Sequence, residues 1–346
     1  MAKIAVIKGD GIGPDVVDEA IKVLKAAAGE AAFEFDELPY GAQHTLDTGI
    51  TIPEDEFARF RTDYDAIFLG ALGDPRIPDM RHGRDILLGA RMKLELFINQ
   101  RPARLLNANF CPLKGYEPGD IDFVIFRENT EGLYVGRGER RDQGTKQEVA
   151  TSEMVATYQG TERIIRAAFE YAKQKARTRV CLAVKDNAIP HAHGLWRDVY
   201  KEVAKDFPEI EASTLYADVA AMEIVGNPKR FDVIVSSNLL GDVLSDLAAM
   251  IVGGLGLAPS ANINPHGTSL FEPVHGSAPD IAGKGLANPM AAIVTSAMMA
   301  DHLGMTDVAR RIERAVMGAI EARELTADLG GNLSTQACGD AVCNRL

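Results

Sequence analysis

The sequence predicts an α/β protein with a largely parallel central sheet that is covered on both faces. Short, continuous apolar runs alternate with longer runs in which apolar residues recur every three and four positions, as they do in amphipathic helices. Strands that are buried on both faces give continuous apolar runs, and such strands belong to parallel sheets with covering helices. The length of 346 residues is sufficient for two domains.

The predicted elements follow one another in that alternation. The run KIAVIKG is the first strand, and Pro14 favours a helix after it, because its missing N–H would be unpaired in a first turn. Continuous apolar runs predict strands at residues 3–9, 64–72, 121–129, 179–187 and 231–238. Three-and-four spacing predicts helices at residues 15–28, 161–176, 195–207, 236–250 and 287–303. Residues 136–152 are polar and lack helical period, so we expect either an exposed loop or a two-stranded arm there.

Composition excludes several classes of protein. Apolar residues make up 46% of the chain and charged residues 25%, which is typical of a soluble globular protein. A net charge of −12 argues against nucleic-acid binding, which depends on phosphate neutralisation by Lys and Arg. No run of 18 apolar residues is present, and Gly9 and Asp10 interrupt the first strand, so we expect neither membrane binding nor a signal peptide. The four cysteines lack metal-ligand spacing and predict a reduced, cytoplasmic protein: Cys111, Cys181, Cys338 and Cys343.

The segment GDGIGP is a candidate dinucleotide-binding loop. Such a loop has the pattern Gly-x-Gly-x-x-Gly between a strand and a helix, with an acidic residue about 20 positions later. Here the glycines are Gly9, Gly11 and Gly13, so the third comes one residue early. The acidic residues Asp36 and Glu37 lie in a poorly marked segment. A tight strand-to-helix turn is therefore favoured over a Rossmann fingerprint.

Three aspartates form a candidate metal site. Asp242 and Asp246 are four positions apart on a predicted helix, so their carboxylates project from one face. Among apolar neighbours the two carboxylates would repel, and a divalent cation would compensate. The alternative is that Asp242 caps the helix and Asp246 faces solvent. Asp218 has similar small and apolar neighbours, and three oxygen donors suit Mg²⁺ or Mn²⁺ better than zinc. We expect His191 and His193 to be solvated loop residues rather than metal ligands.

Arginines, a lysine and a tyrosine form a second candidate group. Arg91, Arg101 and Arg127 could each bind a carboxylate through the planar guanidinium, although each taken singly suits a surface ion pair better. The position of Arg127 at the end of a strand is suggestive, because ligands of open α/β sheets bind beyond the carboxyl ends of strands. Lys185 ends another strand and Tyr134 follows RENTEGL, and both side chains can move protons in catalysis.

Seven motifs occur in order along essentially the whole chain: GDGIGPDVV, NQRPARL, RENTEGLY, KDN, NLLGDVLSDLAAM, GGLGLAPSANI and FEPVHGSAPDIAGKGLANP. Together they resemble the isocitrate/isopropylmalate dehydrogenase family of metal-dependent β-decarboxylating dehydrogenases, and most of all its 3-isopropylmalate and tartrate/D-malate branches. The resemblance implies a two-domain isopropylmalate dehydrogenase-like fold that is not Rossmann, with GDGIGP near the cofactor pyrophosphate. One implied domain combines residues 1–100 and 252–346. The other, residues 101–251, would carry the dimer interface, substrate and metal residues, with 136–152 as a clasp.

The resemblance implies NAD as the cofactor. The residues that match the family's cofactor contacts are Asn187, Glu272, His275, Gly276, Ser277, Ala278, Asp280 and Asn288. A carboxylate at Asp280 can accept hydrogen bonds from both adenosine ribose hydroxyls and would repel a 2′-phosphate. NADP-dependent relatives tend to carry a Lys–Tyr pair where this chain has Asp280 and Ile281.

The resemblance also implies the roles of the charged residues. The three arginines match the clamp on the two malate carboxylates, and the three aspartates match the ligands of Mg²⁺ or Mn²⁺, with K⁺ as a candidate further ion. Lys185 and Asp218 match residues that reach in from a partner subunit, which implies a homodimer with shared sites. The implied catalytic residues are Tyr134, Lys185 and Asp218. Lys185, tuned by Asp218, would assist removal of the hydroxyl proton as hydride passes to NAD, and Tyr134 would reprotonate the enolate after decarboxylation.

The segment RHGRDILLGAR, ahead of the first clamp arginine, sets the substrate in this family. Isocitrate enzymes place Ser and Asn where this chain has Asp85 and Leu87, and Asp85 would repel a third carboxylate. Leu87 and Leu88 resemble the apolar pair that meets the isopropyl group of 3-isopropylmalate, and the Arg of homoisocitrate enzymes is missing at Leu88. Tartrate/D-malate enzymes also carry leucines there, and Arg84 and Asp85 depart from the isopropylmalate pattern. We therefore expect NAD-dependent oxidative decarboxylation of a (2R)-hydroxy acid of the malate type, 3-isopropylmalate first, with tartrate, D-malate or another 3-substituted malate as the alternative.

Overall fold

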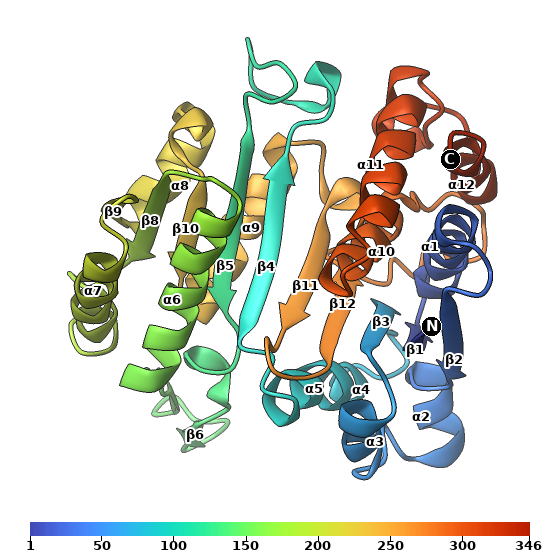
Figure 1. Cartoon of the computed structure of the whole chain (residues 1–346). Coiled ribbons are helices and arrows are strands. Elements are labelled where there is room, and N and C mark those ends of the chain that lie inside the picture. Colours follow the sequence, from blue (N-terminus) through green and yellow to red (C-terminus); the bar gives the residue numbers. More distant parts are fainter. The chain divides into compact units, whose positions relative to one another are not determined.

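The computed structural model describes residues 1–346, which form two compact units. Unit 1 comprises Met1–Leu96, Arg104–Gly119 and Ala249–Leu346, and unit 2 comprises Phe97–Ala103 and Asp120–Ala248. The segment 104–119 thus groups with unit 1, whereas the family resemblance implies that it belongs to the second domain. Both units are α/β with mostly parallel strands, which confirms the predicted fold class (Figure 1). No helix is long and apolar enough to cross a bilayer.

Unit 1 contains five strands in the order β2-β1-β3-β12-β11. Their bounds are β1 (Ala2–Gly9), β2 (Phe33–Leu38), β3 (Ala66–Ala71), β11 (Pro259–Ile263) and β12 (Ser269–Pro273). Neighbouring strands are parallel except β11 and β12, which are antiparallel. Alternate residues of β1 belong to different cores: Ile4 and Val6 pack in one cluster and Ala5 and Ile7 in another. The sheet is therefore buried on both faces, as its continuous apolar runs predict.

Helices supply the two layers that cover this sheet. The first layer contains α1 (Gly13–Ala28), α10 (Met290–His302), α11 (Thr306–Glu321) and α12 (Thr335–Cys343), which share one core cluster. The second core is formed with α3 (Glu56–Thr62), α5 (Gly89–Lys93) and the five-residue π-helix η1 (Arg84–Leu88). Two short helices complete this region: α2 (Ala42–Thr48) and α4 (Arg81–Gly83).

Unit 2 contains strands in the order β4-β5-β10-β8-β9. Their bounds are β4 (Ile98–Arg104, mostly in unit 2), β5 (Asp122–Glu128), β8 (Arg179–Val184), β9 (Glu211–Tyr216) and β10 (Val233–Ser236). The last four run parallel, so their carboxyl ends meet at one edge. The helices are α6 (Tyr158–Gln174), α7 (Ala192–Val203), α8 (Ala217–Gly226) and α9 (Asn238–Ile251). Single 3₁₀ turns lie at Ala108–Phe110, Leu133–Val135, Ala204–Asp206, Pro228–Arg230, Leu255–Leu257 and Ala327–Leu329.

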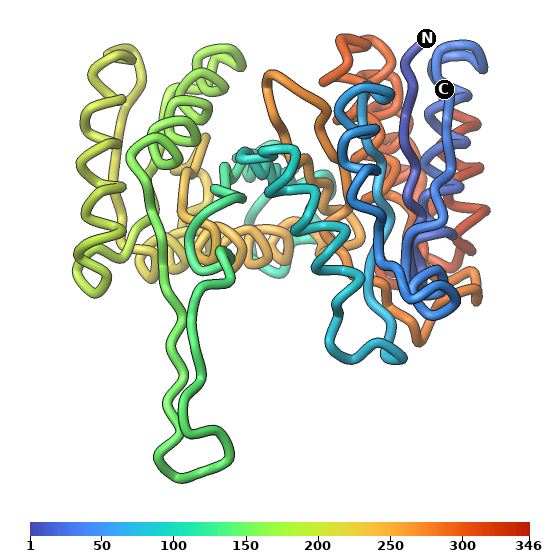
Figure 2. The backbone as a smooth tube through the Cα atoms, turned by 90° about the horizontal axis from the view of Figure 1, so that it is seen from below, coloured from blue at the N-terminus to red at the C-terminus, as the bar shows by residue number.

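The polar segment near residue 140 forms a two-stranded arm. Strands β6 (Gly138–Arg141) and β7 (Val149–Ser152) pair antiparallel, and all their residues are exposed. Figure 2 shows the arm extending away from the rest of unit 2. An isolated hairpin without an apolar partner is marginally stable in water. The arm is therefore marginally stable by itself.

Candidate active site

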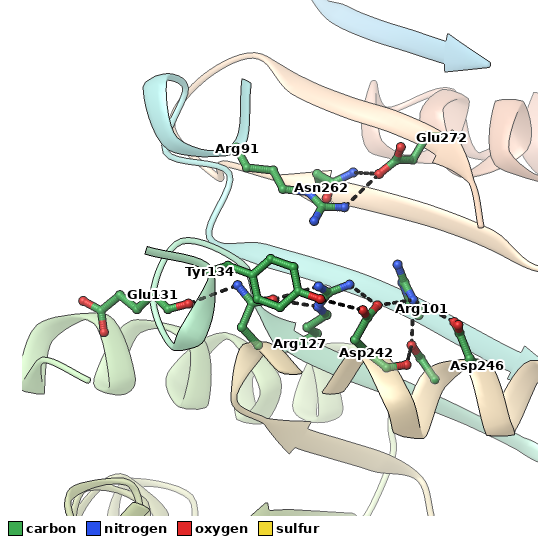
Figure 3. Close-up of polar contacts among 11 residues, drawn as sticks. Arg91, Arg101, Arg127, Glu131, Tyr134, Asp242, Asp246, Asn262 and Glu272 are labelled. Carbon is green, nitrogen blue, oxygen red and sulfur yellow. Dashed lines mark hydrogen bonds and ion pairs between the residues drawn. The ribbon is translucent and has the colours of Figure 1, made fainter. Parts of the chain in front are cut away.

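The carboxyl edge of the unit 2 sheet carries a buried arginine, Arg127, near the end of β5 (Figure 3). Only 2% of this residue is exposed. Its Nε and Nη2 donate to Asn238 Oδ1 at 3.0 and 2.8 Å. Asn238 is the first residue of α9, which follows the neighbouring strand β10. A side chain at Gly241 would place its Cβ 2.8 Å from the Cβ of Arg127, so the missing side chain lets α9 lie against Arg127.

Three donors converge on Asp242, one turn into α9 (Figure 3). Its Oδ1 forms an ion pair with Arg127 and accepts from Arg101 Nη1 at 3.1 Å. Its Oδ2 accepts from the Tyr134 hydroxyl at 3.0 Å. Arg101 Nη1 also lies 3.1 Å from Asp246 Oδ1, so both carboxylates face the same side of the helix. The part of the alternative in which Asp242 caps the helix is wrong, because α9 already begins at Asn238. Its other part holds, since the side chain of Asp246 is 56% exposed.

The two carboxylates of α9 both contact Arg101 Nη1. Burial raises the pKa of Asp246, while Arg101 lowers it and the charge of Asp242 raises it further. The oxygen donors and the negative charge of the pair suit a hard divalent cation. Within one chain, however, no three His, Cys, Asp or Glu side chains converge to hold a metal ion. Asp218, the third predicted ligand, does not join the pair within a single copy of the chain.

Asp218 instead pairs with Lys185. Lys185 follows β8, and Asp218 lies in the first turn of α8, which follows β9. Because β8 and β9 are parallel neighbours, their ends lie side by side. Lys185 Nζ lies 2.8 Å from Asp218 Oδ2, and this contact lowers the pKa of Asp218. The Lys185 ammonium also lies 5.5 Å from the centre of the Tyr216 ring. The side chain of Asp218 is 62% exposed, so the pair is accessible from outside the chain.

His193 departs from the sequence prediction. It was expected in a solvated loop, but residues 192–203 form helix α7, whose buried face includes His193. The prediction was wrong because the pair was assigned to a loop, where no helical face was considered. His191, just before the helix, is exposed as expected.

In unit 1, Arg91 lies in α5 and is 5% exposed. Its Nη2 lies 3.1 Å from Glu272 Oε1, which also accepts from Asn262 Nδ2 at 2.9 Å (Figure 3). Its Nε is buried without a hydrogen-bond partner. An unpaired donor on a buried guanidinium is costly unless an acceptor occupies it, and a carboxylate would be such an acceptor.

The predicted specificity residues lie in the π-helix η1, directly before α5. Single π-turns inside helices are frequent at functional sites. Leu87 is half-buried against the second core of unit 1. Asp85 Oδ2 accepts from the Thr51 hydroxyl at 2.9 Å, and Asp85 also pairs with Arg84 at 3.4 Å. The carboxylate of Asp85 is therefore held by two partners within unit 1.

The GDGIGP loop packs directly against the late motif in unit 1. Ile12 N donates to Ser277 O at 2.8 Å, and a side chain at Gly11 would place its Cβ 1.9 Å from that oxygen. Only glycine permits this approach. His275 Nε2 is buried without a hydrogen-bond partner, and burial lowers the pKa of His275. Asp280 is exposed.

The remaining predicted cofactor residues are divided between the units. Asn288 uses its amide within the protein, since Nδ2 donates to Asp328 and Oδ1 accepts from the Met290 amide, both at 3.0 Å. Gly276 is exposed, and Ala278 adopts a left-handed φ of 38°. Asn187 is exposed in unit 2, two residues after Lys185.

Sequence reasoning missed Asp10, a buried residue of the GDGIGP loop. Asp10 accepts from the backbone amides of Ala42 and Gly73, at 2.6 and 2.8 Å. Its Oδ2 also lies 2.9 Å from Nε2 of His82, which is fully buried just ahead of η1. Asp10 thus joins the glycine loop to the segment that carries Leu87. The signal was available as an acid between glycines at a strand end, where carboxylates often accept backbone hydrogen bonds.

Comparison with known sequences decides the family. A profile described as isocitrate/isopropylmalate dehydrogenase matches residues 3–342. The chain belongs to this family. It is 44% identical over 348 residues to the 3-isopropylmalate dehydrogenase of Thermobifida fusca, covering 99% of this chain and 97% of that protein. It is also 44% identical over 351 residues to the probable tartrate dehydrogenase/decarboxylase of Bacillus subtilis, covering 99% and 98%.

Solved structures agree with this membership. The isocitrate dehydrogenase of Methylococcus capsulatus superposes with a TM-score of 0.91 at 40% identity, covering 100% of this chain and 99% of that one. The TT0538 protein of Thermus thermophilus gives a TM-score of 0.89 at 35% identity, covering 99% of this chain and 68% of that one. Membership of the isocitrate/isopropylmalate dehydrogenase family, shown by these matches, confirms the predicted fold and the predicted class of enzyme.

Proposed function

We propose that the chain catalyses NAD- and divalent-metal-dependent oxidative decarboxylation of a (2R)-hydroxy acid of the malate type, with 3-isopropylmalate as the substrate. The observation that carries this proposal is the convergence of Arg101, Arg127 and Tyr134 on Asp242. It brings anion-binding, proton-donating and metal-ligating groups together at one strand edge. Relatives named 3-isopropylmalate dehydrogenase share 44% and 46% identity with this chain.

The arginines bind the substrate carboxylates in this proposal. Arg101 and Arg127 pair with Asp242 in the free chain, and they would be released to bind the substrate carboxylates if Asp242 held a divalent cation. Arg91 offers its unpaired Nε. Charge-assisted hydrogen bonds from buried guanidinium groups are among the stronger polar contacts in proteins, which suits a substrate with two carboxylates. Leu87 and Leu88 would meet the apolar substituent.

The three aspartates would hold the cation. Their carboxylate oxygens fit Mg²⁺ or Mn²⁺, and K⁺ remains a candidate further ion. When bound, a divalent cation lowers the pKa of a hydroxyl that it contacts and stabilises negative charge on that oxygen. Asp242 and Asp246 come from one chain, and we assign Asp218 to the other chain of a homodimer.

Exposed apolar side chains support the homodimer. Met222 and Val225 on α8 are 73% and 41% exposed, and Leu239 and Val243 on α9 are 40% and 60% exposed. A group of large apolar side chains open to water marks an interaction surface. A second copy on these helices would bring the exposed Lys185–Asp218 pair to its neighbour's α9.

The chain's own residues move the protons. Lys185, as the neutral amine, accepts the hydroxyl proton and becomes the ammonium while the hydride leaves for NAD. Asp218, 2.8 Å from Nζ, holds the lysine in place. The β-carboxylate then departs as carbon dioxide. Tyr134 then donates its hydroxyl proton to the carbon atom from which the carboxylate has departed. The Tyr134 hydroxyl already donates toward this site, to Asp242. Asp280 and His275 Nε2 would bind the ribose and the neighbouring part of NAD.

The test is NADH formation by metal-stripped protein reloaded with Mn²⁺ or Mg²⁺ in the presence of K⁺. 3-Isopropylmalate, D-malate, tartrate, isocitrate and homoisocitrate are compared by kcat/KM, with Tyr134→Phe as the inactive control. The highest value with 3-isopropylmalate supports the proposal. The highest value with tartrate or D-malate moves the assignment to that branch, which the Bacillus subtilis relative favours. Turnover of none of the five refutes it.

A further inference from the structure

The buried His193 makes one hydrogen bond with each of its two ring nitrogens. Nδ1 accepts from the backbone amide of Lys185 at 2.9 Å, and Nε2 lies 3.1 Å from the hydroxyl oxygen of Ser237. A backbone amide can only donate, so Nδ1 carries no proton. The neutral ring therefore has its proton on Nε2 and donates it to Ser237. Burial lowers the pKa of His193, and the nearby charge of Asp186 opposes this only in part.

The ring bridges two strand ends where the sheet no longer joins them. The ladder between β8 and β10 has its last residue pair at Ala183 and Ser236. Lys185 and Ser237 lie beyond that pair, on separate chain segments. Their relative position is therefore not set by the ladder. His193 has no exposed surface, and its two hydrogen bonds connect these segments beyond the last residue pair of the ladder.

Each bridged end leads to a group of the proposed reaction. On one side is Lys185, which takes the hydroxyl proton. On the other side Ser237 precedes Asn238, whose Oδ1 accepts twice from Arg127. Arg127 in turn pairs with Asp242. In the proposed homodimer, Lys185 of one chain serves the neighbour's site and Arg127 serves the chain's own site. One imidazole thus connects a proton-transfer lysine of one site to a carboxylate-binding arginine of the adjacent site.

We propose that His193 is a positioning residue that fixes Lys185 relative to the Ser237–Asn238 start of α9, and through it Arg127. This proposal rests on the proposed function, because it assigns consequences to kcat and to KM. Loss of the Nδ1 contact shifts Lys185 and lowers kcat. Loss of the Nε2 contact shifts Asn238 and Arg127 and raises the KM for the hydroxy acid.

Variants separate these two contacts. In His193→Asn the Oδ1 can still accept from the Lys185 amide, but the shorter side chain does not reach Ser237. We expect kcat close to wild type and a KM raised about fivefold, the effect of one hydrogen bond. Ser237→Ala should raise KM equally. The double variant should then show no further increase, because both changes remove the same bond.

His193→Leu, similar in size, removes both contacts and leaves the Lys185 amide without its acceptor. We expect kcat to fall at least tenfold and KM to rise as in His193→Asn. The matched control is His191→Leu, at an exposed residue whose side chain makes no cap hydrogen bond. If His193→Leu lowers the unfolding temperature while kcat and KM stay at control values, the residue is structural only and the proposal fails. Additive KM effects of His193→Asn and Ser237→Ala would overturn the coupling.

A measurement without turnover keeps the two proposals apart. In protein labelled with ¹⁵N-histidine, the signal absent from His193→Asn identifies His193, and we expect a protonated Nε2 and an unprotonated Nδ1 at neutral pH. Ser237→Ala should shift the Nε2 signal. A protonated Nδ1 would overturn the inferred bridge, whether or not the enzyme turns over. Turnover of no malate-type substrate would refute the proposed function and leave this result standing.

Discussion

The contact between Gly241 and Arg127 predicts that Gly241→Ala damages stability and substrate binding together. The added Cβ would lie 2.8 Å from Arg127 Cβ, 2.9 Å from its Cγ and 3.2 Å from its Cα. These atoms are at the backbone end of a side chain that is 2% exposed, so they cannot swing aside. Either α9 or Arg127 must move.

The magnitude follows from three contributions. Overpacking costs about 1–3 kcal/mol. Weakening the charged hydrogen bonds of Arg127 costs about 1.5–3 kcal/mol. Alanine in a helix returns about 1 kcal/mol relative to glycine. We therefore expect the free energy of unfolding to fall by about 1.5–5 kcal/mol, and the KM for the hydroxy acid to rise more than tenfold.

Urea denaturation and steady-state kinetics measure both effects, and Gly194→Ala in α7 is the matched control. A Cβ at Gly194 meets nothing within 4 Å, so only the helix-propensity gain applies and the control should be as stable as wild type or more. If Gly241→Ala were as stable as the control and kept the wild-type KM, the close approach of α9 to Arg127 would not constrain residue 241.

Three further predictions concern titration and specificity. Because burial raises the pKa of Asp246, the affinity for Mn²⁺, measured by calorimetry, should decline as pH falls. Asp246→Asn should weaken Mn²⁺ binding and make the affinity less dependent on pH. Equal Mn²⁺ affinity of the wild-type protein at pH 5.5 and 7.5 would contradict this prediction. Asp280→Asn should lower kcat/KM for NAD at least tenfold, and it should reduce the ratio of kcat/KM for NAD to kcat/KM for NADP. If that ratio were unchanged, Asp280 would be excluded from ribose binding. Burial lowers the pKa of His193, His275 and His302 in the folded protein. As pH falls, these histidines therefore bind protons at a higher pH in the unfolded chain than in the folded one. The free energy of unfolding should then decrease as pH falls below about 6.5, and a flat urea midpoint from pH 7.5 to 5.5 would be inconsistent with neutral buried histidines.

Five of the strands with buried residues could be predicted because their environment is uniform, whereas β11 and β12, although buried, were missed. In β3 every residue is buried, as its continuous apolar run predicts. The edge strands β2 and β9 were missed for the opposite reason. In β2 only Phe33 is buried, and in β9 no residue is, so neither strand needs an apolar sequence.

The candidate site was predictable only in part. The four-residue spacing of Asp242 and Asp246 places them on one face of any helix, and the structure confirms that they share Arg101. The partner of Arg127 could not be predicted. Asn238 reaches it because β10 pairs with β5, and strand pairing of this kind depends on the whole sheet. The same holds for His193, whose two partners follow different strands.

The discontinuity of unit 1 has a consequence for synthesis. Unit 2 is nearly continuous in sequence, whereas β3 pairs with β12, roughly 200 residues later, and α1 shares its core with α10 and α12. During translation the N-terminal strands and α1 therefore cannot complete their packing, and their apolar faces stay uncovered, until the last quarter of the chain has left the ribosome. Unit 2 can fold in that interval. Nascent chains stopped before β12 should expose the α1 face to chaperones, and completion of the chain should release them.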